Sequence, residues 1–414
     1  MKPSVDRPTS IWFLAPQAAR IVSTLLVVIL ASSAPGNWSA PSPSARAAGL
    51  PLGSAIVPSS VDDAVLAPPE GVSAQAAFVI DATAGTPLYS LLPDERRAPA
   101  SLTKIATALV VLDHAPLDDV VTIEASDLVD PSESHIGLVD GDRLTVRSLL
   151  YGLLVPSGND AANALARYVG ASLPGGDSAA TGDQRAAFIA AMNGLAKAMG
   201  LQNTAFLNAS GINQEGHFSS ARDLATLTGR AMQDSTFAEI VATVKMDLVS
   251  EADPNQVYPI ATTNDLLLDG TVTGVKTGTT SEAGGCLITS STINGDLVLS
   301  VILGSAIVPD DQGNLKSPAR FDDARLILGA IPTDYAWVDP TDPATFEGLD
   351  QELSAWRAGL QGRTAVVVPV ARRDELRYRV VLGPAGSPDA QVGKVVFLVG
   401  NDPLSEQPLF QIAA

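Results

Sequence analysis

Residues 99–104 have the sequence PASLTK, and an apolar run, IATALVVL, follows at residues 105–112. Pro99 suits the first turn of a helix, and a run that is apolar on all sides predicts a helix buried inside a domain. Ser101 and Lys104 are three positions apart, so they share one face of this helix. A hydroxyl beside an amine at the start of a buried helix is a candidate nucleophile with its base.

The composition describes a large, acidic, globular chain. It has 414 residues, of which 46% are hydrophobic, and a formal net charge of −19. This length allows a large core. Nucleic acid binds positively charged surfaces, so this negative chain lacks the charge for it, and anionic lipid would repel the chain. We therefore expect no nucleic-acid partner.

Residues that form disulfides or bind metals are few and scattered. Cys286 is the only cysteine, so no disulfide can form within the chain. Its strand-like surroundings favour a small buried side chain over a reactive thiol. The three histidines, His114, His135 and His217, lack the spacing of a zinc site. We expect no metal and no cofactor.

The N-terminal part predicts export from the cytoplasm. Basic residues near the start precede an apolar run at residues 21–34, and small residues suited to cleavage follow at 32–34 and 45–47. The run is short for a membrane span. We interpret residues 1–47 as a signal peptide or as an uncleaved anchor that associates with the membrane, and the Pro- and Ser-rich residues 48–73 as a linker. Both interpretations make the remainder extracytoplasmic.

The pattern of residues 74–335 predicts one α+β domain. A strand–turn–strand pattern at residues 77–90 leads to the buried helix, and residues 144–244 are mostly helical. Strand signals return at residues 272–303, within which Asn294-Gly295 predicts a hairpin. Strands at both ends of a helical block predict an antiparallel sheet flanked by helices.

A second, smaller domain is expected after residue 335. A segment rich in Pro and Asp at residues 339–343 interrupts the pattern, and three β runs separated by turn signals follow at residues 364–399. We expect a small all-β domain over residues 336–414.

Three short motifs contain the residue types that acyl transfer needs. They are Ser101-Leu102-Thr103-Lys104, Ser157-Gly158-Asn159 and Lys276-Thr277-Gly278-Thr279. Each motif alone is common by chance. Their order, their local contexts and the export signal together indicate one catalytic site.

The first two motifs can supply a nucleophile, a base and a proton relay. A serine hydroxyl becomes a nucleophile when a base takes its proton. Lys104 can be that base if it is neutral, which burial and a neighbouring cation such as Lys276 would favour. Ser157 can relay the proton to the leaving amine, although it can also be a helix cap, and Asn159 can donate to a peptide carbonyl.

The third motif suits an extended peptide. An exposed edge strand binds a peptide through main-chain hydrogen bonds, and Gly278 lets the substrate backbone approach closely. Lys276 and Thr277 suit a substrate carboxylate. This pattern predicts acyl transfer on a peptide with a free C-terminal carboxylate, by a Ser-Lys site and not by a Ser-His-Asp triad.

Longer segments around the motifs resemble the serine-type D-alanyl-D-alanine carboxypeptidases, which are low-molecular-mass penicillin-binding proteins of peptidase family S11. The resemblance covers about residues 74–335 and is carried by residues 99–104, 149–162, 216–224 and 273–280. It implies that 74–335 is a D,D-peptidase catalytic domain, and that the substrate is a peptidoglycan stem peptide ending in D-Ala-D-Ala. It also implies that β-lactams are covalent inhibitors.

The resemblance implies a role for each motif residue. Ser101 would be acylated and Lys104 would be its base, with Ser157 and Asn159 as the second element of the site. Lys276 and Thr277 would face the substrate carboxylate and the proton relay, and the backbone N–H groups of Ser101 and Thr279 would form the oxyanion hole. Arg320 would also hold the carboxylate, unless it is a solvated arginine at a helix start, and His217 is expected to be structural.

Two other functions stay open from the sequence. A serine β-lactamase needs a deacylating base, commonly a Glu and an Asn four positions apart. Glu251 and Asn255 have this spacing but lie far from Ser157 in the chain. A catalytically silent cell-wall-binding protein would act through its β domain, and the intact motifs argue against it.

Overall fold

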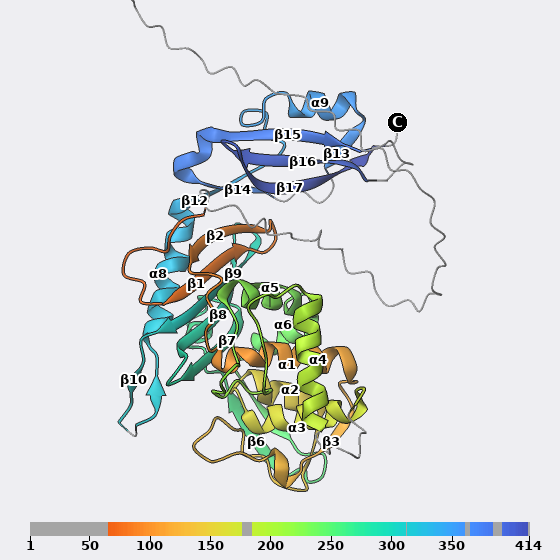
Figure 1. The fold of residues 1–414 in the computed structure, drawn as a ribbon, viewed down its shortest axis with the longest axis vertical. Coiled ribbons are helices and arrows are strands. Elements are labelled where there is room, and N and C mark those ends of the chain that lie inside the picture. The colour runs from red at the N-terminus through yellow and green to blue at the C-terminus, as the bar shows by residue number, and fades with distance from the viewer. Residues whose placement is uncertain (1–64, 176–183, 312, 361–364, 384–390, 413–414) are drawn as a thin grey trace, which may run out of the picture.

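The computed structural model describes residues 65–175, 184–311, 313–360, 365–383 and 391–412. These residues form a larger α+β part and a smaller, mostly β part at the C-terminal end, which is blue in Figure 1. The expected fold class is confirmed. The segment predicted to be a signal peptide or anchor lies outside the described residues.

An antiparallel sheet of five strands forms the centre of the larger part. Its order is β2-β1-β9-β8-β7, so β7 lies at one edge, as predicted. The predicted hairpin joins β8 to β9, and both Asn294 and Gly295 have positive φ, as a tight hairpin turn requires. The strands are β1 (Ala76–Asp81), β2 (Thr86–Leu91), β7 (Gly274–Thr280), β8 (Gly284–Ile293) and β9 (Asp296–Ser305).

Helices cover both faces of this sheet because successive strand side chains point to opposite sides. Phe78 packs into the core of the helical block, whereas the next residue, Val79, packs into the core beneath α8 (Ala319–Asp334). Each fully buried side chain of this size stabilises the fold by roughly 1.5–3 kcal/mol. The sheet is therefore fixed from both sides, and the edge strand β7 is held in place by β8.

The helical block lies on the first face, at the end of the molecule away from the C-terminal part (Figure 1). Ser101 does not begin the α-helix itself. It lies in a single 3₁₀ turn, η1 (Ala100–Thr103), which Ala100 begins with a positive φ of 49°. The helices are α1 (Lys104–His114), α2 (Val146–Leu154), α3 (Asn159–Ser172), α4 (Gln184–Ala198), α5 (Ala221–Ala231) and α6 (Ser235–Val241).

Short elements complete the larger part. One of them, the β5–β6 hairpin, was not predicted, because apolar residues at exposed positions, such as Val249 and Val257, hide the alternation of its strands. These elements are β3 (Val120–Thr122), η2 (Ala125–Asp127), β4 (Arg143–Thr145), β5 (Lys245–Val249), β6 (Val257–Ala261), α7 (Asp265–Leu268), β10 (Val308–Pro309) and β11 (Leu315–Lys316).

The C-terminal part has its own core. A sheet of order β13-β17-β16-β15 packs with the β12–β14 pair and α9, and the rings of Phe346 and Phe397 lie 5.0 Å apart in this core. The elements are β12 (Tyr335–Val338), α9 (Leu349–Ala355), β13 (Ala358–Leu360), β14 (Val366–Pro369), η3 (Val370–Glu375), β15 (Leu376–Leu382), β16 (Gln391–Val399) and β17 (Asp402–Gln411). Within the described residues, no helix combines the length and apolar character needed to cross a bilayer.

Residues 65–73, at the end of the segment predicted as a linker, connect the two parts. Val65 packs against the core of the C-terminal part. The N–H of Leu66 donates to the carbonyl of Leu88 at 3.1 Å and to the hydroxyl of Tyr335 at 3.2 Å. The N–H and hydroxyl of Ser73 donate to Asp323 at 2.7 and 2.9 Å. We call residues 65–73 the N-terminal strap.

Candidate active site

Lys104 lies at the centre of the predicted catalytic residues. It is the first residue of α1, and its side chain is fully buried. Its Nζ donates to Ser101 Oγ at 3.0 Å, to Asn159 Oδ1 at 2.6 Å and to the carbonyl of Ser210 at 2.7 Å. The structure therefore brings the first two motifs together, and three oxygens satisfy the three protons of the ammonium.

Burial lowers the pKa of Lys104 to about 7, although Asp160 and Glu133 act in the opposite direction. Burial also lowers the pKa of Lys276, and repulsion from Lys104 and Arg320 acts in the same direction. Because repulsion between two amines is mutual, it agrees with the expectation that Lys276 favours the neutral form of Lys104. A lysine that titrates near neutral pH can take a proton from Ser101.

Ser157 has a free hydroxyl in an unusual backbone position. Its φ is 72°, in the left-handed region, and its side chain is buried, with 6% exposed. The hydroxyl has no hydrogen-bond partner in the described part of the chain. The helix-cap alternative is wrong, because Gly158 is the N-cap of α3 and no side chain caps it. A buried hydroxyl without a partner is available to a bound molecule.

Strand β7 passes directly beside Ser101. A Cβ atom on Gly278 would lie 3.0 Å from the backbone nitrogen of Ser101 and 3.0 Å from Ala100 Cβ, so a side chain at this position would force the two segments apart. Glycine therefore brings the third motif to the nucleophile. The oxyanion hole of Ser101 and Thr279 N–H groups stays a prediction.

Two cations lie along the active-site end of β7. Lys276 is buried and donates to the carbonyl of Thr277 at 3.0 Å. Arg320, from α8, donates to the carbonyl of Gly278 at 3.0 Å and to Thr279 Oγ1 at 2.7 Å. Arg320 is 9% exposed, so the alternative of a solvated arginine is wrong. Two buried positive charges beside an edge strand suit a carboxylate.

The structure adds three residues that sequence reasoning missed. Ser210 offers its carbonyl to Lys104, Thr263 shares a hydrogen bond between hydroxyl groups with Thr277, and Glu133 accepts from Asn159 at 2.8 Å. Ser210 is followed by Gly211, whose φ of 87° lets this loop pass against the carbonyl of Ala100. None of the three lies in a motif, and only the proximity of Thr263 to β7 in the chain could have indicated it.

His217 is a neutral, structural residue in this arrangement. Its Nδ1 accepts from the N–H of Leu207 at 3.0 Å, so the neutral ring carries its proton on Nε2 and donates to Thr103 Oγ1 at 2.8 Å. The ring thereby attaches the loop that contains Ser210 to the turn that contains Ser101. These contacts support the structural role expected from the sequence.

His217 should make the stability of the fold depend on pH. Burial lowers its pKa from 6.5 to about 4, so the unfolded chain binds more protons between these pH values. The stabilisation is complete above pH 6.5 and is lost as the pH falls through 4, with a total on the order of 3 kcal/mol. In urea denaturation, we expect His217→Gln to remove this part of the pH dependence. An unchanged pH dependence in the variant would contradict the assignment.

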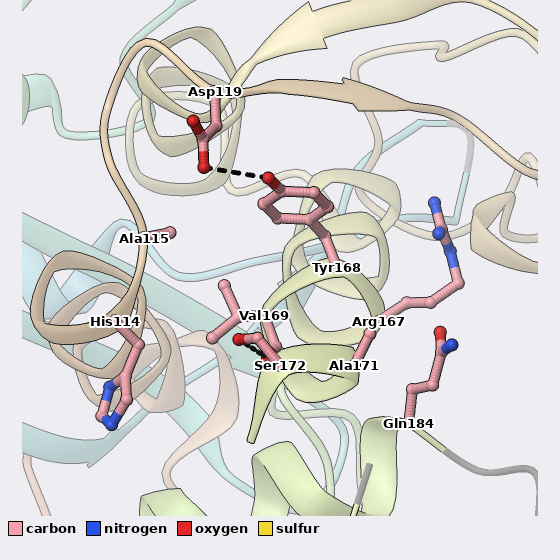
Figure 2. A pocket seen from close by; sticks show the side chains of 9 residues that line it. All are labelled: His114, Ala115, Asp119, Arg167, Tyr168, Val169, Ala171, Ser172 and Gln184. Atoms are coloured by element: carbon pink, nitrogen blue, oxygen red, sulfur yellow. Dashed lines mark hydrogen bonds between the residues drawn. The ribbon is translucent and has the colours of Figure 1, made fainter. Parts of the chain in front are cut away.

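The pocket in Figure 2 lies away from this site. It has a volume of about 370 Å³ and lies at the C-terminal ends of α1 and α3, next to His114 and Ser172. The catalytic residues occupy the N-terminal ends of the same helices, roughly 15 Å away along α1. Two of its hydroxyl groups are already bonded, since Tyr168 donates to Asp119 and Ser172 donates to a backbone carbonyl.

The remaining reactive side chains have other roles. Cys286 is fully buried on β8, and burial raises the pKa of its thiol to about 11, which confirms the expectation of a small core residue. Among the described residues, no group of three or more His, Cys, Asp or Glu side chains is arranged to hold a metal ion.

The fold and the site together define a serine acyl-transfer enzyme whose base is a lysine. Four features meet at one place. They are a serine on a 3₁₀ turn, a lysine that begins the buried helix α1, a second serine on a tight turn, and a cationic edge strand. No histidine contacts Ser101 among the described residues, which distinguishes the site from a Ser-His-Asp triad.

Comparison with known proteins identifies the family. The family model for D-alanyl-D-alanine carboxypeptidase, peptidase S11, matches residues 63–306. The chain therefore belongs to the S11 family of serine-type D-alanyl-D-alanine carboxypeptidases, which are hydrolases and include penicillin-binding proteins.

Individual relatives show how far the similarity extends. The D-alanyl-D-alanine carboxypeptidase of Streptomyces sp. strain K15 is 36% identical over 250 residues, which are 58% of this chain and 83% of that protein. The crystal structure of the Streptomyces K15 DD-transpeptidase has a TM-score of 0.56 and 35% identity, over 62% of this chain and 96% of that one. The Bacillus subtilis carboxypeptidase DacF is 32% identical over 56% of this chain and 58% of its own length.

The C-terminal part also has a counterpart among solved structures. Penicillin binding protein 5 from Haemophilus influenzae is similar over 83% of this chain and 98% of its own, with a TM-score of 0.63 and 24% identity. This likeness concerns the fold alone and supports the architecture of an α+β part followed by a β part.

Proposed function

We propose that the chain removes the terminal D-alanine from peptidoglycan pentapeptides through an acyl-enzyme on Ser101. The observation that carries the proposal is the contact between Lys104 and Ser101 next to β7, where two buried cations can bind the C-terminal carboxylate. The edge strand can bind the peptide backbone, and the carboxylate limits the substrate to a peptide end.

In the first half of the reaction, neutral Lys104 takes the proton of Ser101 Oγ, and Oγ attacks the carbonyl carbon of the penultimate D-alanine. The tetrahedral oxyanion lies at the N–H groups of Ser101 and Thr279. The unpartnered hydroxyl of Ser157 passes its proton to the leaving nitrogen and takes the proton held by Lys104, so that Lys104 is neutral again for the second half of the reaction. The C–N bond then breaks, D-alanine leaves with its carboxylate, and the rest of the peptide stays bonded to Ser101.

In the second half, a water molecule attacks the acyl carbon and Lys104 takes a proton from it by the same route. The ester bond to Oγ breaks, and Ser101 recovers its proton. Asn159 holds the peptide through its side-chain amide, while Lys276, Thr277 and Arg320 hold the carboxylate in the first half. A β-lactam carries an amide and a carboxylate in a similar arrangement, so it should acylate Ser101 as well.

The β-lactamase alternative receives no support from the structure. Glu251 and Asn255, the pair with the required spacing, lie in the exposed turn between β5 and β6, where Asn255 bonds to Asp253 at 3.0 Å. This pair therefore supplies no deacylating base next to Ser101. The silent cell-wall-binding alternative is likewise disfavoured, because the catalytic side chains are connected by hydrogen bonds.

The substrate assignment can be tested with two peptides that differ in one group. A peptide ending in D-Ala-D-Ala should release D-alanine, and the same peptide with a C-terminal amide should react about 100-fold more slowly, because it loses the charge pairing with Lys276 and Arg320. A coupled D-amino acid oxidase assay measures the free product, and chromatography measures the amide product. Equal rates for both peptides would contradict the carboxylate site.

We also propose that the chain acts outside the cytoplasm on the cell wall. Membership of the S11 family supports this location. Signal cleavage and membrane association through residues 1–47 concern a segment outside the described residues and stay predictions.

A further inference from the structure

Glu133 carries a carboxylate that the reaction described above does not use. It lies in the loop between η2 and β4, and its side chain is partly buried. Its Oε2 accepts from Asn159 Nδ2 at 2.8 Å, while Asn159 Oδ1 accepts from Lys104 at 2.6 Å. A continuous chain of hydrogen bonds thus runs from Ser101 through Lys104 and Asn159 to Glu133.

The loop holds Glu133 firmly in this place. The carbonyl of the next residue, Ser134, accepts from the N–H of Asn159 at 2.7 Å, and the N–H of Glu133 donates to the carbonyl of Asp130 at 2.9 Å. The carboxylate of Asp160, at the start of α3, fixes the following residues of the loop. It accepts the N–H groups of Ile136, Gly137 and Leu138, all at 3.1 Å.

The amide of Asn159 needs a partner that defines its direction. The nitrogen of a side-chain amide donates hydrogen bonds and the oxygen accepts them, and a rotation of the amide by about 180° exchanges their positions. Protonated Lys104 can only donate, so it selects the amide oxygen. Neutral Lys104, the form that acts as a base, can also accept, so it no longer selects one end. A carboxylate accepts only, and it selects the amide nitrogen at every stage of the reaction.

We propose that Glu133 is a positioning residue that keeps the Asn159 amide in one orientation in both protonation states of Lys104. The amide nitrogen has two N–H bonds, and one of them donates its hydrogen bond to Glu133. The second proton is then directed to the substrate carbonyl. This inference rests on the proposed function, in which Asn159 binds the peptide.

Glu133 has a second effect through its charge. The charged groups that face Lys104 are Glu133 from the loop, Asp160 from α3 and Lys276 from β7, with Arg320 beside Lys276. Glu133 favours the protonated amine and raises the pKa of Lys104. Removing only its charge should therefore let Lys104 lose its proton at a lower pH.

The variant Glu133→Gln keeps the shape of the side chain at position 133 but removes its ability to orient the amide of Asn159. Glutamine keeps the length of the side chain but can donate as well as accept, so the amide of Asn159 loses its fixed direction. We expect kcat/KM for a peptide ending in D-Ala-D-Ala to fall about 10-fold, mainly through a higher KM. We also expect the midpoint of the pH profile of Ser101 acylation by penicillin to move to a lower pH.

Three further variants make the test specific. Glu251→Gln removes the same charge from an exposed site, and it should leave KM and the pH midpoint unchanged. In the Asn159→Ala background, Glu133→Gln should lower kcat/KM by less than 2-fold, because the group that it orients is gone. Thermal unfolding of each variant shows whether the fold is kept, and Glu133→Asp, which retains the acceptor, should recover part of kcat/KM.

Each result of these experiments either supports or overturns the positioning role of Glu133. A Glu133→Gln protein with wild-type KM and pH midpoint would overturn it, as would an undiminished effect in the Asn159→Ala background. If the wild-type chain is acylated by penicillin but releases no D-alanine, the proposed substrate is wrong, and the pH midpoint and acylation rate still test Glu133. If Ser101 is not acylated at all, the proposed function and the role of Glu133 both fail.

Discussion

Ser101→Ala should abolish the covalent penicillin adduct and lower D-alanine release by about 10⁴-fold or more. The reason is that Ser101 Oγ is the atom that forms the acyl bond, and the other groups can only assist a direct attack by water. Mass mapping of the adduct and a timed assay of D-alanine release measure the two effects.

Ser354→Ala is a suitable control for this experiment. Ser354 is exposed on α9 in the C-terminal part, so labelling and D-alanine release should stay close to those of the wild-type protein. An adduct on any other serine, or a Ser101→Ala protein that still releases D-alanine at the wild-type rate, would contradict the assignment of the nucleophile.

Lys104→Arg should lower the acylation rate of Ser101 by about 10³-fold, because it keeps a positive charge at the site but cannot give up a proton at ordinary pH. In the wild-type protein the rate should rise as the pH increases through about 7, where Lys104 becomes neutral. The variant should lose this rise. The measurement is the second-order rate of penicillin acylation between pH 5 and 9.

Lys316→Arg is the matched control, since Lys316 is exposed on β11. The guanidinium is larger than the ammonium, so circular dichroism and thermal unfolding should confirm that Lys104→Arg is folded. Lys104→Met, which removes the charge and fits a buried site, provides a second test with the same expected loss. If either variant keeps the wild-type pH midpoint, Lys104 is not the base.

The sequence was sufficient to predict the main architecture and the central catalytic group. Hydrophobic periodicity located most helices and strands of the α+β part, because those elements bury one continuous face. The turn at Asn294-Gly295 was predictable for a local reason, since it needs positive φ at both positions. Ser101, Lys104 and Asn159 were predictable because each lies in a short motif with a chemical role.

Other features depend on contacts between distant segments and have no local signal. Glu133 belongs to the site because Asp160 and Asn159 bind its loop, and the surrounding sequence does not indicate that contact. The β5–β6 hairpin escaped prediction because its exposed residues include apolar side chains such as Val249 and Val257. The closeness of Lys104, Lys276 and Arg320, which makes their charges interact, likewise has no local signal in the sequence.

The N-terminal strap has a mechanical consequence. Tension applied at residue 65 would first act on the hydrogen bonds of Leu66 with β2 and Tyr335, and then on those of Ser73 with Asp323, before it reached β1 in the middle of the sheet. The strap would therefore relieve strain on the sheet that contains β7. Under such tension, the distance between β7 and Ser101 should stay constant until the hydrogen bonds of the strap break.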